Sequence, residues 1–392
     1  MGEWKSFQVG EIGKVITGKT PKTSISDNYG GYIPFLTPSD DMSVKYVRKT
    51  AKTLTEKGLS EVKNAILPAN SVCVSCIGSD LGKVVITTRP TVTNQQINSI
   101  VVDEARFDIS FVYYAMRILG KKLNFISKTS TAVPIVNKSS FSSYEIECPS
   151  LKEQKQIAAV LSVLDAKIEC NRMINDNLQQ QLFSLYENMA MTSPCLKEYT
   201  LSNLCDFQEG YVNPPQTHPE YFDGEVKWLR AVDINESFII ETSRTLTKAG
   251  FESAKKSALL FEPSTIAISK SGTIGRLGII ADYMCGNRAV INIAPHDTNM
   301  LAFIYCFLKS KQREFPDMAV GSVQKNLYVS LLEPLSVSVP DNESLTAFNA
   351  VGASILGMIH NNCVENTDLA NLRDTILPKL MSGEIDVSSV LL

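Results

Sequence analysis

The sequence has no long hydrophobic run and very little histidine. No stretch of its 392 residues approaches the roughly 18 consecutive apolar residues that a membrane-spanning helix needs. Residues 1–5 lack the basic-then-apolar order of a secretory signal. The three histidines, His218, His296 and His360, lie far apart, and no serine or cysteine sits in a nucleophile-elbow motif. We therefore expect a cytoplasmic protein without a membrane partner and without a catalytic triad.

Metal ligands are also scarce. Of the nine cysteines, only Cys73 and Cys76 have a zinc-type spacing, and no second Cys or His pair lies at finger or ribbon distance. The odd number and the scattered positions suit a reducing compartment better than a disulfide framework. The neighbouring Asp40 and Asp41 lack the spaced acid and lysine of a metal-dependent nuclease, so they are interpreted as solvated loop residues. We expect no metal site.

Two short motifs resemble cofactor sites, but their surroundings exclude both. Residues 13–20 match the phosphate-binding loop pattern, yet Pro21 follows where a helix should begin, and the corresponding part of the second half differs. Residues 213–216, Asn-Pro-Pro-Gln, resemble the motif with which amino-methyltransferases hold a flipped base. Gln216 cannot stack on a base, and no glycine-rich cofactor loop precedes the motif. A rigid turn is the better interpretation, and we expect no cofactor bound by this chain.

The formal net charge of −3 is unusual for a protein that binds nucleic acid, but the charge is unevenly distributed. Residues 1–150 carry 18 Lys and Arg against 13 Asp and Glu, and residues 191–340 carry 14 against 16. Residues 341–392 carry 2 against 7. Because each contacted phosphate releases counterions locally, an acidic C-terminal segment does not exclude a phosphate-binding surface elsewhere.

The second half of the sequence repeats the first at an offset of about 190–195 residues. Residues 9–36 resemble 201–229, each with a strand-like opening, a polar loop, Tyr with Gly, and a second strand. Thr53-Leu54-Thr55 matches Thr245-Leu246-Thr247, and residues 66–83 match 260–276. Val and Ile alternate between Gly and Pro in both copies, which indicates β-hairpins. A short apolar helix follows in each copy, at 111–119 and at 302–308.

Each half ends at a proline, Pro149 or Pro340, and a long helical segment follows. The sequence thus predicts an α+β fold with two tandem β-rich domains, separated by two long antiparallel helices that form a coiled coil. We expect domains at 1–150 and 193–340, long helices at 151–192 and 341–382, and a tail at 383–392.

A narrow seam with steps of three and four residues runs along each predicted helix. In the first helix it contains Ile157, Leu161, Leu164, Ile168, Asn171, Asn175, Leu178, Leu182 and Leu185. In the second it contains Phe348, Gly352, Ile355, Ile359, Asn362, Asn366, Leu369, Arg373 and Ile376. A seam asparagine costs stability unless it meets a polar partner, so the two pairs favour one register.

A pseudo-two-fold relation between the copies would make the two helices antiparallel and place the domains at opposite ends. The 29 residues from 157 to 185, which the first seam spans, would form a rod of roughly 43 Å. Two base-recognising domains on one side of a duplex need about one DNA turn, roughly 34–36 Å. The predicted target is therefore a bipartite DNA site.

Polar loops at corresponding places in the two copies are the best candidates for DNA contacts. Residues 79–83 and 270–276 each end in a cation, and Gln95-Gln96 corresponds to Arg288. Gln can pair bidentately with adenine and Arg with guanine. Residues 137–138 and 324–325 are interpreted as a third matching loop. The candidate DNA contacts are Lys19, Thr20, Lys22, Lys83, Gln95, Gln96, Lys138, Arg230, Lys270, Arg276, Arg288, Gln324 and Lys325.

Several segments carry a resemblance to a known family over the whole chain. They are residues 16–21 (ITGKTP) with 29–31 (YGG) and 33–40 (IPFLTPSD), residues 149–158 (PSLKEQKQIA) with 164–168 (LDAKI), and residues 372–385 (LRDTILPKLMSGEI). The last two groups are the more specific ones. On these residues the chain resembles the specificity subunits of type I restriction-modification systems. It departs from the pattern at residues 207–212 (FQEGYV) and at the weakened junction 340–344 (PDNES).

The resemblance implies a subunit without a catalytic site that recognises two half-sites of double-stranded DNA, one with each domain. Its helices would set the spacer, and it would hold two adenine methyltransferase subunits, to which restriction subunits that translocate and cut DNA are added. S-adenosylmethionine would be used by the methyltransferase and ATP with Mg²⁺ by the restriction subunit. Half-site sequences do not follow from the resemblance, because recognition domains vary between members.

Two other functions stay open at this point. The first is a stand-alone two-domain DNA-binding regulator, which a neighbouring methyltransferase gene or co-purification of that subunit would argue against. The second is a methyltransferase in its own right, which the missing cofactor loop disfavours and a test for S-adenosylmethionine binding would decide.

Overall fold

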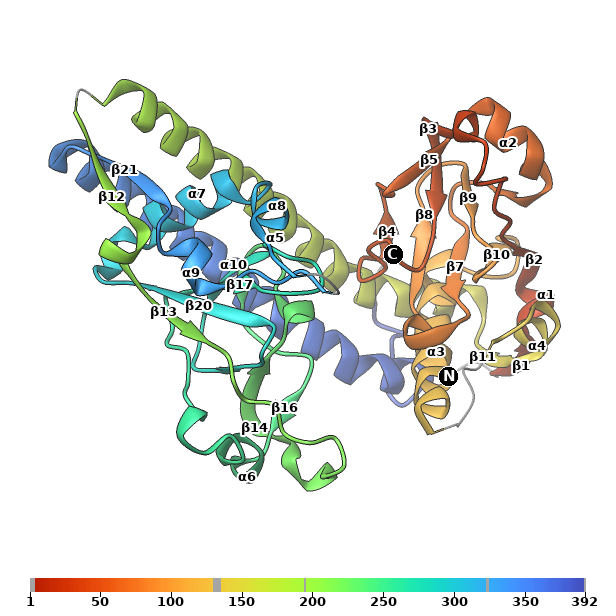
Figure 1. Cartoon of the computed structure of the whole chain (residues 1–392). Helices are drawn as coiled ribbons and strands as arrows, with labels where there is room; N and C mark the ends of the chain where they lie inside the picture. The colour runs from red at the N-terminus through yellow and green to blue at the C-terminus, as the bar shows by residue number, and fades with distance from the viewer. Residues whose placement is uncertain (1–3, 130–134, 194, 322–323, 391–392) are drawn as a thin grey trace. The chain divides into compact units, whose positions relative to one another are not determined.

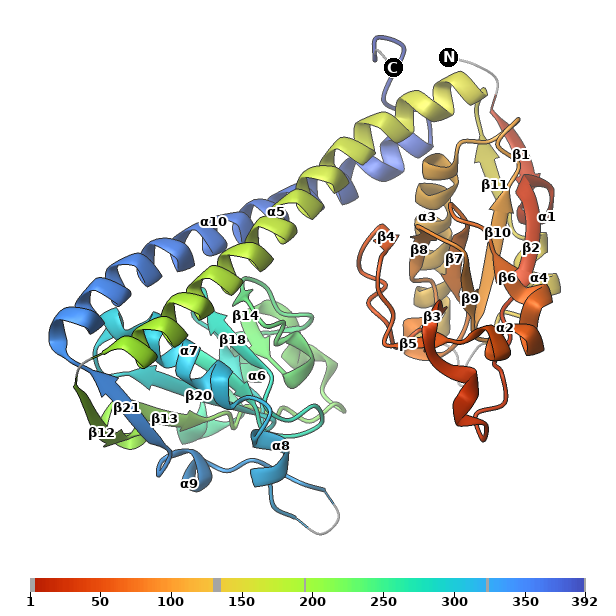
Figure 2. The same ribbon diagram turned by 90° about the horizontal axis from the view of Figure 1, so that it is seen from above.

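The chain forms two β-rich units of similar construction. The computed structural model describes residues 4–129, 135–193, 195–321 and 324–390 (Figures 1 and 2). Unit 1 comprises Met1–Glu169 together with Leu369–Leu392, and unit 2 comprises Cys170–Asp368. The C-terminal segment therefore belongs to the same unit as the N-terminal one. In the described part of the chain, no helix combines the length and the apolar character that crossing a bilayer requires.

The described residues of unit 1 form three sheets. The five-stranded sheet has the order β2 (Gly13–Thr17), β10 (Ile97–Val102), β7 (Val72–Ser75), β8 (Val84–Thr87) and β4 (Tyr46–Val47). The four-stranded sheet has the order β5 (Lys52–Leu54), β3 (Tyr29–Leu36), β9 (Thr91–Thr93) and β6 (Ile66–Leu67). β1 (Lys5–Gln8) pairs antiparallel with β11 (Glu145–Cys148).

Unit 2 repeats this topology, except that the pairing of β6 with β9 is reduced to an isolated bridge between Phe261 and Met284. Its five-stranded sheet has the order β13 (Cys205–Glu209), β20 (Val290–Pro295), β17 (Ile266–Ser269), β18 (Leu277–Ile280) and β15 (Phe238–Ile239). A three-stranded sheet has the order β16 (Thr245–Leu246), β14 (Phe222–Leu229) and β19 (Cys285–Gly286), and β12 (Leu196–Thr200) pairs with β21 (Ser336–Pro340). The internal repeat expected from the sequence is confirmed.

Both faces of each five-stranded sheet are buried, because successive side chains of a strand point to opposite faces. In unit 1, Val72 and Val74 face a core shared with α3 (Ile109–Thr129), while Cys73 between them faces a core shared with Leu36 of the four-stranded sheet. In unit 2, Ile266 and Ile268 pack in the core that contains α7 (Leu301–Lys311), while Ala267 packs with Leu229 and Phe261.

Short helices complete the units. They are α1 (Val9–Ile12), α2 (Glu56–Val62), α4 (Lys138–Ser143), α6 (Lys248–Glu252), α8 (Phe315–Met318) and α9 (Val329–Leu332). Short 3-10 turns lie at η1 (Ser26–Asn28), η2 (Lys63–Ala65), η3 (Gly78–Asp80), η4 (Leu201–Asn203), η5 (Pro219–Tyr221), η6 (Ala231–Asp233), η7 (Lys255–Ser257) and η8 (Thr298–Met300).

Two local expectations are wrong. The strand-like opening at residue 9 is the helical turn α1, because the Gln8 backbone N–H donates to the Glu11 carboxylate at 2.7 Å in a capping box. The expected helix 111–119 continues through Gly120 to Thr129. Glycine is tolerated inside this helix because a Cβ at position 120 would lie 2.1 Å from the Gly82 carbonyl oxygen, so the close approach of the two backbones requires it.

The two long helices are α5 (Leu151–Thr192) and α10 (Asn342–Met381). In unit 2, Asn171 of α5 donates to Asn366 of α10 at 3.0 Å, and Asn362 of α10 donates to Asn175 of α5 at 2.8 Å. In unit 1, Asp165 of α5 pairs with Arg373 of α10, and Gln156 donates to the Val390 carbonyl beyond the end of α10. Residue numbers thus rise along α5 while those of the α10 partners fall. The two helices pack antiparallel within each unit, as Figures 1 and 2 show and as the sequence predicts.

The structure places most of the predicted seam between the two helices or against a domain core. Fully or nearly buried are Ile157, Leu161, Ile168, Asn171, Asn175, Leu182, Ile355 and Ile359. Partly buried are Leu164, Leu178, Asn362, Asn366, Leu369 and Ile376. Leu185, in contrast, is 41% exposed, so α5 turns this position away from its neighbours.

The seam asparagines meet one another. Asn171 donates to Asn366 at 3.0 Å and to Glu365 at 2.7 Å, and Asn362 donates to Asn175.

Replacing Asn175 by Leu removes the acceptor of the Asn362 amide, and we expect this variant to lose about 1–3 kcal/mol of its free energy of unfolding, measured in urea. The double variant Asn175→Leu with Asn362→Leu should recover that loss, because an apolar pair replaces a polar one. A single variant as stable as the wild type would contradict this.

A buried polar cluster joins the domain of unit 1 to its helices. Arg373 Nη1 lies 2.6 Å from Asp165 Oδ1, and the two side chains are 13% and 9% exposed. The Tyr114 hydroxyl donates to the same carboxylate. Lys45, only 8% exposed, donates to Ser162 of α5 at 2.8 Å. Burial lowers the pKa of Lys45 to about 8, although the Asp165 carboxylate opposes that shift.

The C-terminal tail packs on the start of the chain. Val387 is buried in the core of unit 1, and Gly383 lies against the Trp4 ring. The Gln156 side chain of α5 donates to the Val390 carbonyl at 3.0 Å. These contacts explain why residues that are last in the sequence complete the first unit.

Candidate nucleic-acid interface

In unit 1, polar loops meet at one end of the five-stranded sheet. The Gly18 N–H donates to the Ile97 carbonyl at 3.1 Å, and the Cys76 N–H donates to the Gln96 carbonyl at 2.8 Å. The Val136 N–H in turn donates to the Cys76 carbonyl at 3.0 Å. The segments that carry Lys19-Thr20, Gln95-Gln96, Lys83 and Lys138 are therefore held side by side.

These three backbone hydrogen bonds and the segments that they join are called the loop frame, and unit 2 has the same three bonds. The Gly210 N–H donates to the Val290 carbonyl at 2.9 Å, the Lys270 N–H to the Ala289 carbonyl at 2.7 Å, and the Leu327 N–H to the Lys270 carbonyl at 2.9 Å. Gly18 thus corresponds to Gly210, Cys76 to Lys270, and Val136 to Leu327. The frame brings Lys270, Arg276, Arg288, Gln324 and Lys325 to the same end of their sheet.

A tight turn lies at the centre of each frame. In unit 1, the Asn94 side chain accepts from the Gln96 N–H at 3.1 Å, and its carbonyl accepts from the Ile97 N–H at 3.2 Å. In unit 2, Asn287 accepts from Ala289 at 3.0 Å and from Val290 at 3.1 Å. An Asn at the first turn position fixes the backbone in this way. Gln95 and Arg288 therefore occupy the same turn position.

The cation-terminated loops also correspond. Ser75 donates its N–H to the Lys83 carbonyl at 2.9 Å, and Ser269 donates to the Arg276 carbonyl at 2.9 Å. Both loops turn through a glycine with positive φ, +87° at Gly82 and +86° at Gly275, which is a backbone conformation that favours glycine. Lys83 forms an exposed ion pair with Asp80 at 2.6 Å.

The candidate interface of unit 1 is cationic. Lys19, Lys22 and Lys138 are exposed, and none forms an ion pair within the described residues. The Thr20 hydroxyl donates to the Gln95 amide oxygen at 2.6 Å, which orients the Gln95 amide. Gln96 accepts from the Asn94 amide at 3.0 Å. Unpaired lysines beside oriented amides suit phosphates and base edges, respectively.

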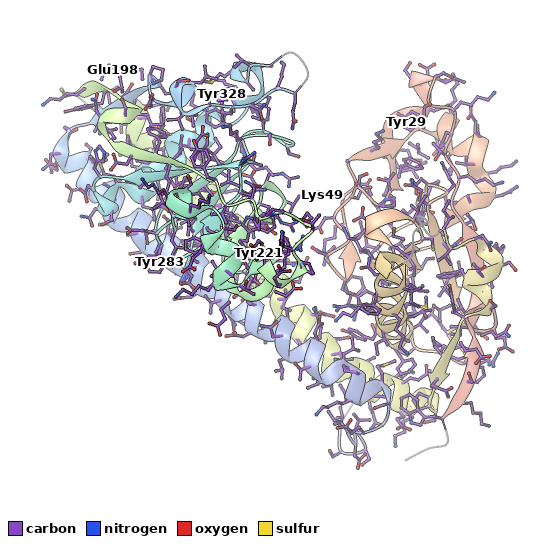
Figure 3. All side chains as sticks on the ribbon, turned by 60° about the horizontal axis from the view of Figure 1, so that its bottom comes forward. Tyr29, Lys49, Glu198, Tyr221, Tyr283 and Tyr328 are labelled. Atoms are coloured by element: carbon purple, nitrogen blue, oxygen red, sulfur yellow. The ribbon has the colours of Figure 1, made fainter. Side chains whose placement is uncertain are left out.

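The interface of unit 2 has a different chemistry that the sequence did not reveal. Lys270 Nζ lies 2.8 Å from the Glu209 carboxylate and over the ring of Tyr328, labelled in Figure 3. The Tyr211 hydroxyl donates to the same carboxylate, whose charge raises the pKa of Tyr211. Beside the frame that the two units share, Tyr211 takes the place of Lys19, and Tyr328 takes the place of Asn137. Comparing residues directly after Gly18 and Gly210 could have pointed to Tyr211.

Arg230 lies next to the unit 2 turn, because the Leu229 carbonyl accepts from the Asn287 N–H at 2.9 Å. Its guanidinium stacks over the Trp228 ring and donates to Ser243. The backbone N–H groups of Arg230 and Ser243 both donate to Asp233. This side chain is therefore held within unit 2 and only partly exposed.

Asp40 is the counterpart of Asp233, and the expectation of a solvated loop residue is wrong for it. Asp40 is 8% exposed and accepts from the Thr37 N–H at 2.7 Å and from the Ala51 N–H at 2.6 Å. The hydrogen bonds from two otherwise unpaired backbone donors offset the free-energy cost of burying this carboxylate. Each unit uses this aspartate to fix the loop that follows β3 or β14.

The expected match of residues 137–138 with 324–325 is also wrong. Asn137 caps α4, and its counterpart is Tyr328, which precedes α9. Lys138 therefore corresponds to Val329. Gln324 and Lys325 instead lie next to Asn326, which pairs with Val320 in an isolated bridge. Among the described residues, Gln324 and Lys325 therefore have no counterpart at 137–138 of unit 1.

The motifs resembling cofactor sites are structural. Gly13–Thr17 is a strand, and an extended loop rather than a helix follows Lys19, so no phosphate-binding loop forms. Cys73 and Cys76 are buried, and burial raises the pKa of Cys73 to about 12, which disfavours the thiolate that zinc needs. No group of three His, Cys, Asp or Glu side chains suited to a metal ion occurs in the described ranges.

The comparisons with known proteins agree on one family. The model of the type I restriction modification DNA specificity domain matches residues 1–180 and again 196–367. The type I restriction enzyme MjaIX specificity subunit of Methanocaldococcus jannaschii is 26% identical over 99% of this chain and 95% of its own length. The HindI specificity subunit of Haemophilus influenzae is 33% identical over 46% of this chain and 41% of its own.

A solved structure shares the fold. The crystal structure of the type I restriction-modification S subunit from M. genitalium aligns with a TM-score of 0.50 at 18% identity. The alignment covers 97% of this chain and 96% of that one. The family match occurs twice, once on each half of the internal repeat.

Proposed function

Because the chain belongs to the type I restriction-modification DNA specificity family, we propose that each unit recognises one half of a bipartite DNA site through its loop frame. The chain is a specificity subunit that recognises DNA and assembles with other subunits of such a system, and it is not itself an enzyme. The observation that supports the bipartite proposal is the repetition of one backbone frame with different side chains. One frame serves both halves, and the side chains make the two halves different.

The proposed DNA contacts divide by chemistry. Exposed cations would position the duplex through its phosphates, and the amide and guanidinium groups at the turns would contact base edges. The phosphate contacts are Lys19, Lys22, Lys83, Lys138, Arg276 and Lys325, with Thr20 beside them, and the base contacts are Gln95, Gln96, Arg288 and Gln324. Lys270 and Arg230 are held by internal partners, so we assign them to positioning the loops.

The long helices would set the distance between the half-sites. We retain recognition domains at 1–150 and 193–340, with the helix 151–192 continuing from one into the other. Each residue inserted into a long helix lengthens it by about 1.5 Å. An insertion in the helices would therefore change the length of the DNA spacer between the two half-sites that the protein accepts.

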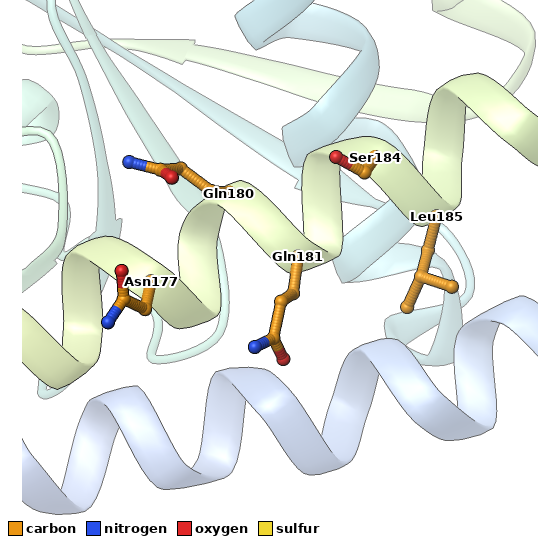
Figure 4. Close-up of a pocket in the computed structure, with 5 residues that line it drawn as sticks. All are labelled: Asn177, Gln180, Gln181, Ser184 and Leu185. Atoms are coloured by element: carbon orange, nitrogen blue, oxygen red, sulfur yellow. The ribbon is translucent and has the colours of Figure 1, made fainter.

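The outer face of α5 is the proposed docking surface for the methyltransferase subunits, two per complex. Asn177, Gln180, Gln181, Ser184 and Leu185 line a shallow hollow there, and Figure 4 shows their side chains along one stretch of the helix. Polar, uncharged side chains with one exposed leucine suit a stable protein contact better than a phosphate contact. S-adenosylmethionine would act in those subunits and ATP with Mg²⁺ in the restriction subunits, all in the cytoplasm.

Methylation mapping tests this function. In cells that express the chain with the methyltransferase subunit of its system, we expect methylated adenines at one bipartite motif, and none when the chain is omitted. The purified chain alone should bind DNA weakly and transfer no methyl group. Methyl transfer by the isolated chain would contradict the proposal, and specific DNA binding without any methyltransferase partner would favour a stand-alone regulator.

A further inference from the structure

The two turns at the centre of the frames present different side chains from one rigid backbone. Gln95 and Arg288 both occupy the position after the asparagine, and each turn is tied to three neighbouring segments. The Asn94 N–H donates to the Leu36 carbonyl at 3.0 Å in unit 1, as Asn287 does to Leu229 at 2.9 Å in unit 2. Such bonds limit movement of the turn, so its exposed side chain meets a ligand from a fixed point.

Arg288 is available for a ligand. It is exposed, and within the parts of unit 2 that the structure describes no hydrogen bond or ion pair engages its guanidinium. The nearby Glu209 carboxylate is already occupied by Lys270 at 2.8 Å and by Tyr211 at 3.2 Å. An unpaired guanidinium has two parallel donors, and the guanine edge in the major groove has two acceptors, O6 and N7.

Gln95 presents a different pattern of hydrogen-bonding groups from Arg288, with an acceptor as well as donors. Its amide oxygen accepts from Thr20, which fixes the orientation of the amide and leaves one oxygen lone pair and both N–H groups available. One acceptor beside one donor matches adenine, which offers the N6 amino group and N7 in the major groove. The same backbone position therefore carries complementary chemistry for two different purines.

We propose that Gln95 recognises an adenine in the half-site of unit 1 and that Arg288 recognises a guanine at the corresponding position of the half-site of unit 2. This inference rests on the proposed function and names the two residues that make the site asymmetric at that position. Exchange of the two side chains should therefore exchange the two base preferences.

Methylation mapping of variants in the complete complex is the first test. Arg288→Gln should replace the required guanine by adenine, or relax that position, in one half-site only, and Gln95→Arg should change the other half-site toward guanine. Arg89→Gln is the matched control, because Arg89 is exposed in the loop before β9, away from the turn. It should leave both half-sites unchanged.

A base analogue separates a direct contact from a loss of structure or affinity. Replacing the guanine by 7-deazaguanine removes N7 and should weaken binding of the wild-type complex about tenfold but that of Arg288→Gln less than twofold. 7-Deazaadenine should act in the same way through Gln95. This measurement also decides the case in which a variant abolishes methylation.

Two results would overturn the inference: wild type and variant losing equal affinity on the 7-deaza base, or both variants methylating the same motif as the wild type. A wild-type complex that methylates no bipartite motif would instead overturn the proposed function itself.

Discussion

The variant Asp165→Ala is expected to lose about 3 kcal/mol of stability, measured by urea unfolding. Its carboxylate is 9% exposed and binds the Arg373 guanidinium at 2.6 Å, and it also accepts from the Tyr114 hydroxyl. Removing it leaves a buried guanidinium whose one remaining ion-pair partner among the described residues is the neighbouring Asp374, at 2.9 Å. Losing one member of a buried pair is costly because the other remains desolvated.

Two further variants make this expectation decisive. Asp368 is an exposed aspartate on α10, and Asp368→Ala should change stability by no more than about 0.5 kcal/mol. The double variant Asp165→Leu with Arg373→Met should recover most of the loss, since Asp374 keeps Arg117 at 3.1 Å and Lys121 at 2.9 Å. A loss below about 1 kcal/mol for Asp165→Ala would show that the pair contributes little.

The second large effect concerns DNA affinity. Replacing Lys19, Lys22 and Lys138 together by glutamine should weaken binding of the chain to a duplex by roughly 100-fold at low salt. All three side chains are exposed and none forms an ion pair within 4.0 Å among the described residues, although the Lys22 charge interacts with the Glu61 carboxylate. The slope of log affinity against log salt should become shallower by about 2.7, since each lost phosphate contact contributes about 0.9.

A control with the same change of net charge distinguishes a local contact from a general electrostatic effect. Lys63, Lys152 and Lys155 are also exposed, but they lie outside the loop frame of unit 1. Their joint replacement by glutamine should leave the salt slope within about 0.5 of the wild-type value. If both triple variants weaken binding equally, the interface lies elsewhere on the unit.

Local sequence patterns were sufficient for much of the fold. The steps of three and four residues around Ile157 and Leu161 predict a helix because they give one apolar stripe only at 3.6 residues per turn. α5 and α10 begin and end within one residue of the expected bounds. Helix signals failed where the decisive partner is remote in the sequence, as at Gly120, which is kept inside α3 by the backbone of Gly82.

The candidate interface was predictable only in part. Lys83 and Arg276 follow glycines in matching loops, so a comparison of the two halves finds them. The same comparison could have pointed to Tyr211, which follows the glycine that matches Gly18, but it gives no signal for Tyr328. The roles of both tyrosines come from the Lys270–Glu209 pair that holds them in one cluster. Asp40 was misinterpreted for the same reason, since its two backbone donors lie on separate loops.

The sequence by itself determined the duplication, the β-rich character of each half and the two paired helices, because repeats and hydrophobic periods are properties of residues near one another in the chain. The tertiary structure alone decided that Gln95, and not Gln96, shares the turn position of Arg288, and that the tail after Gly383 completes unit 1. It also decided which charges are buried with partners and which stay exposed. Those outcomes depend on hydrogen bonds and desolvation between segments far apart in sequence, which no local pattern encodes.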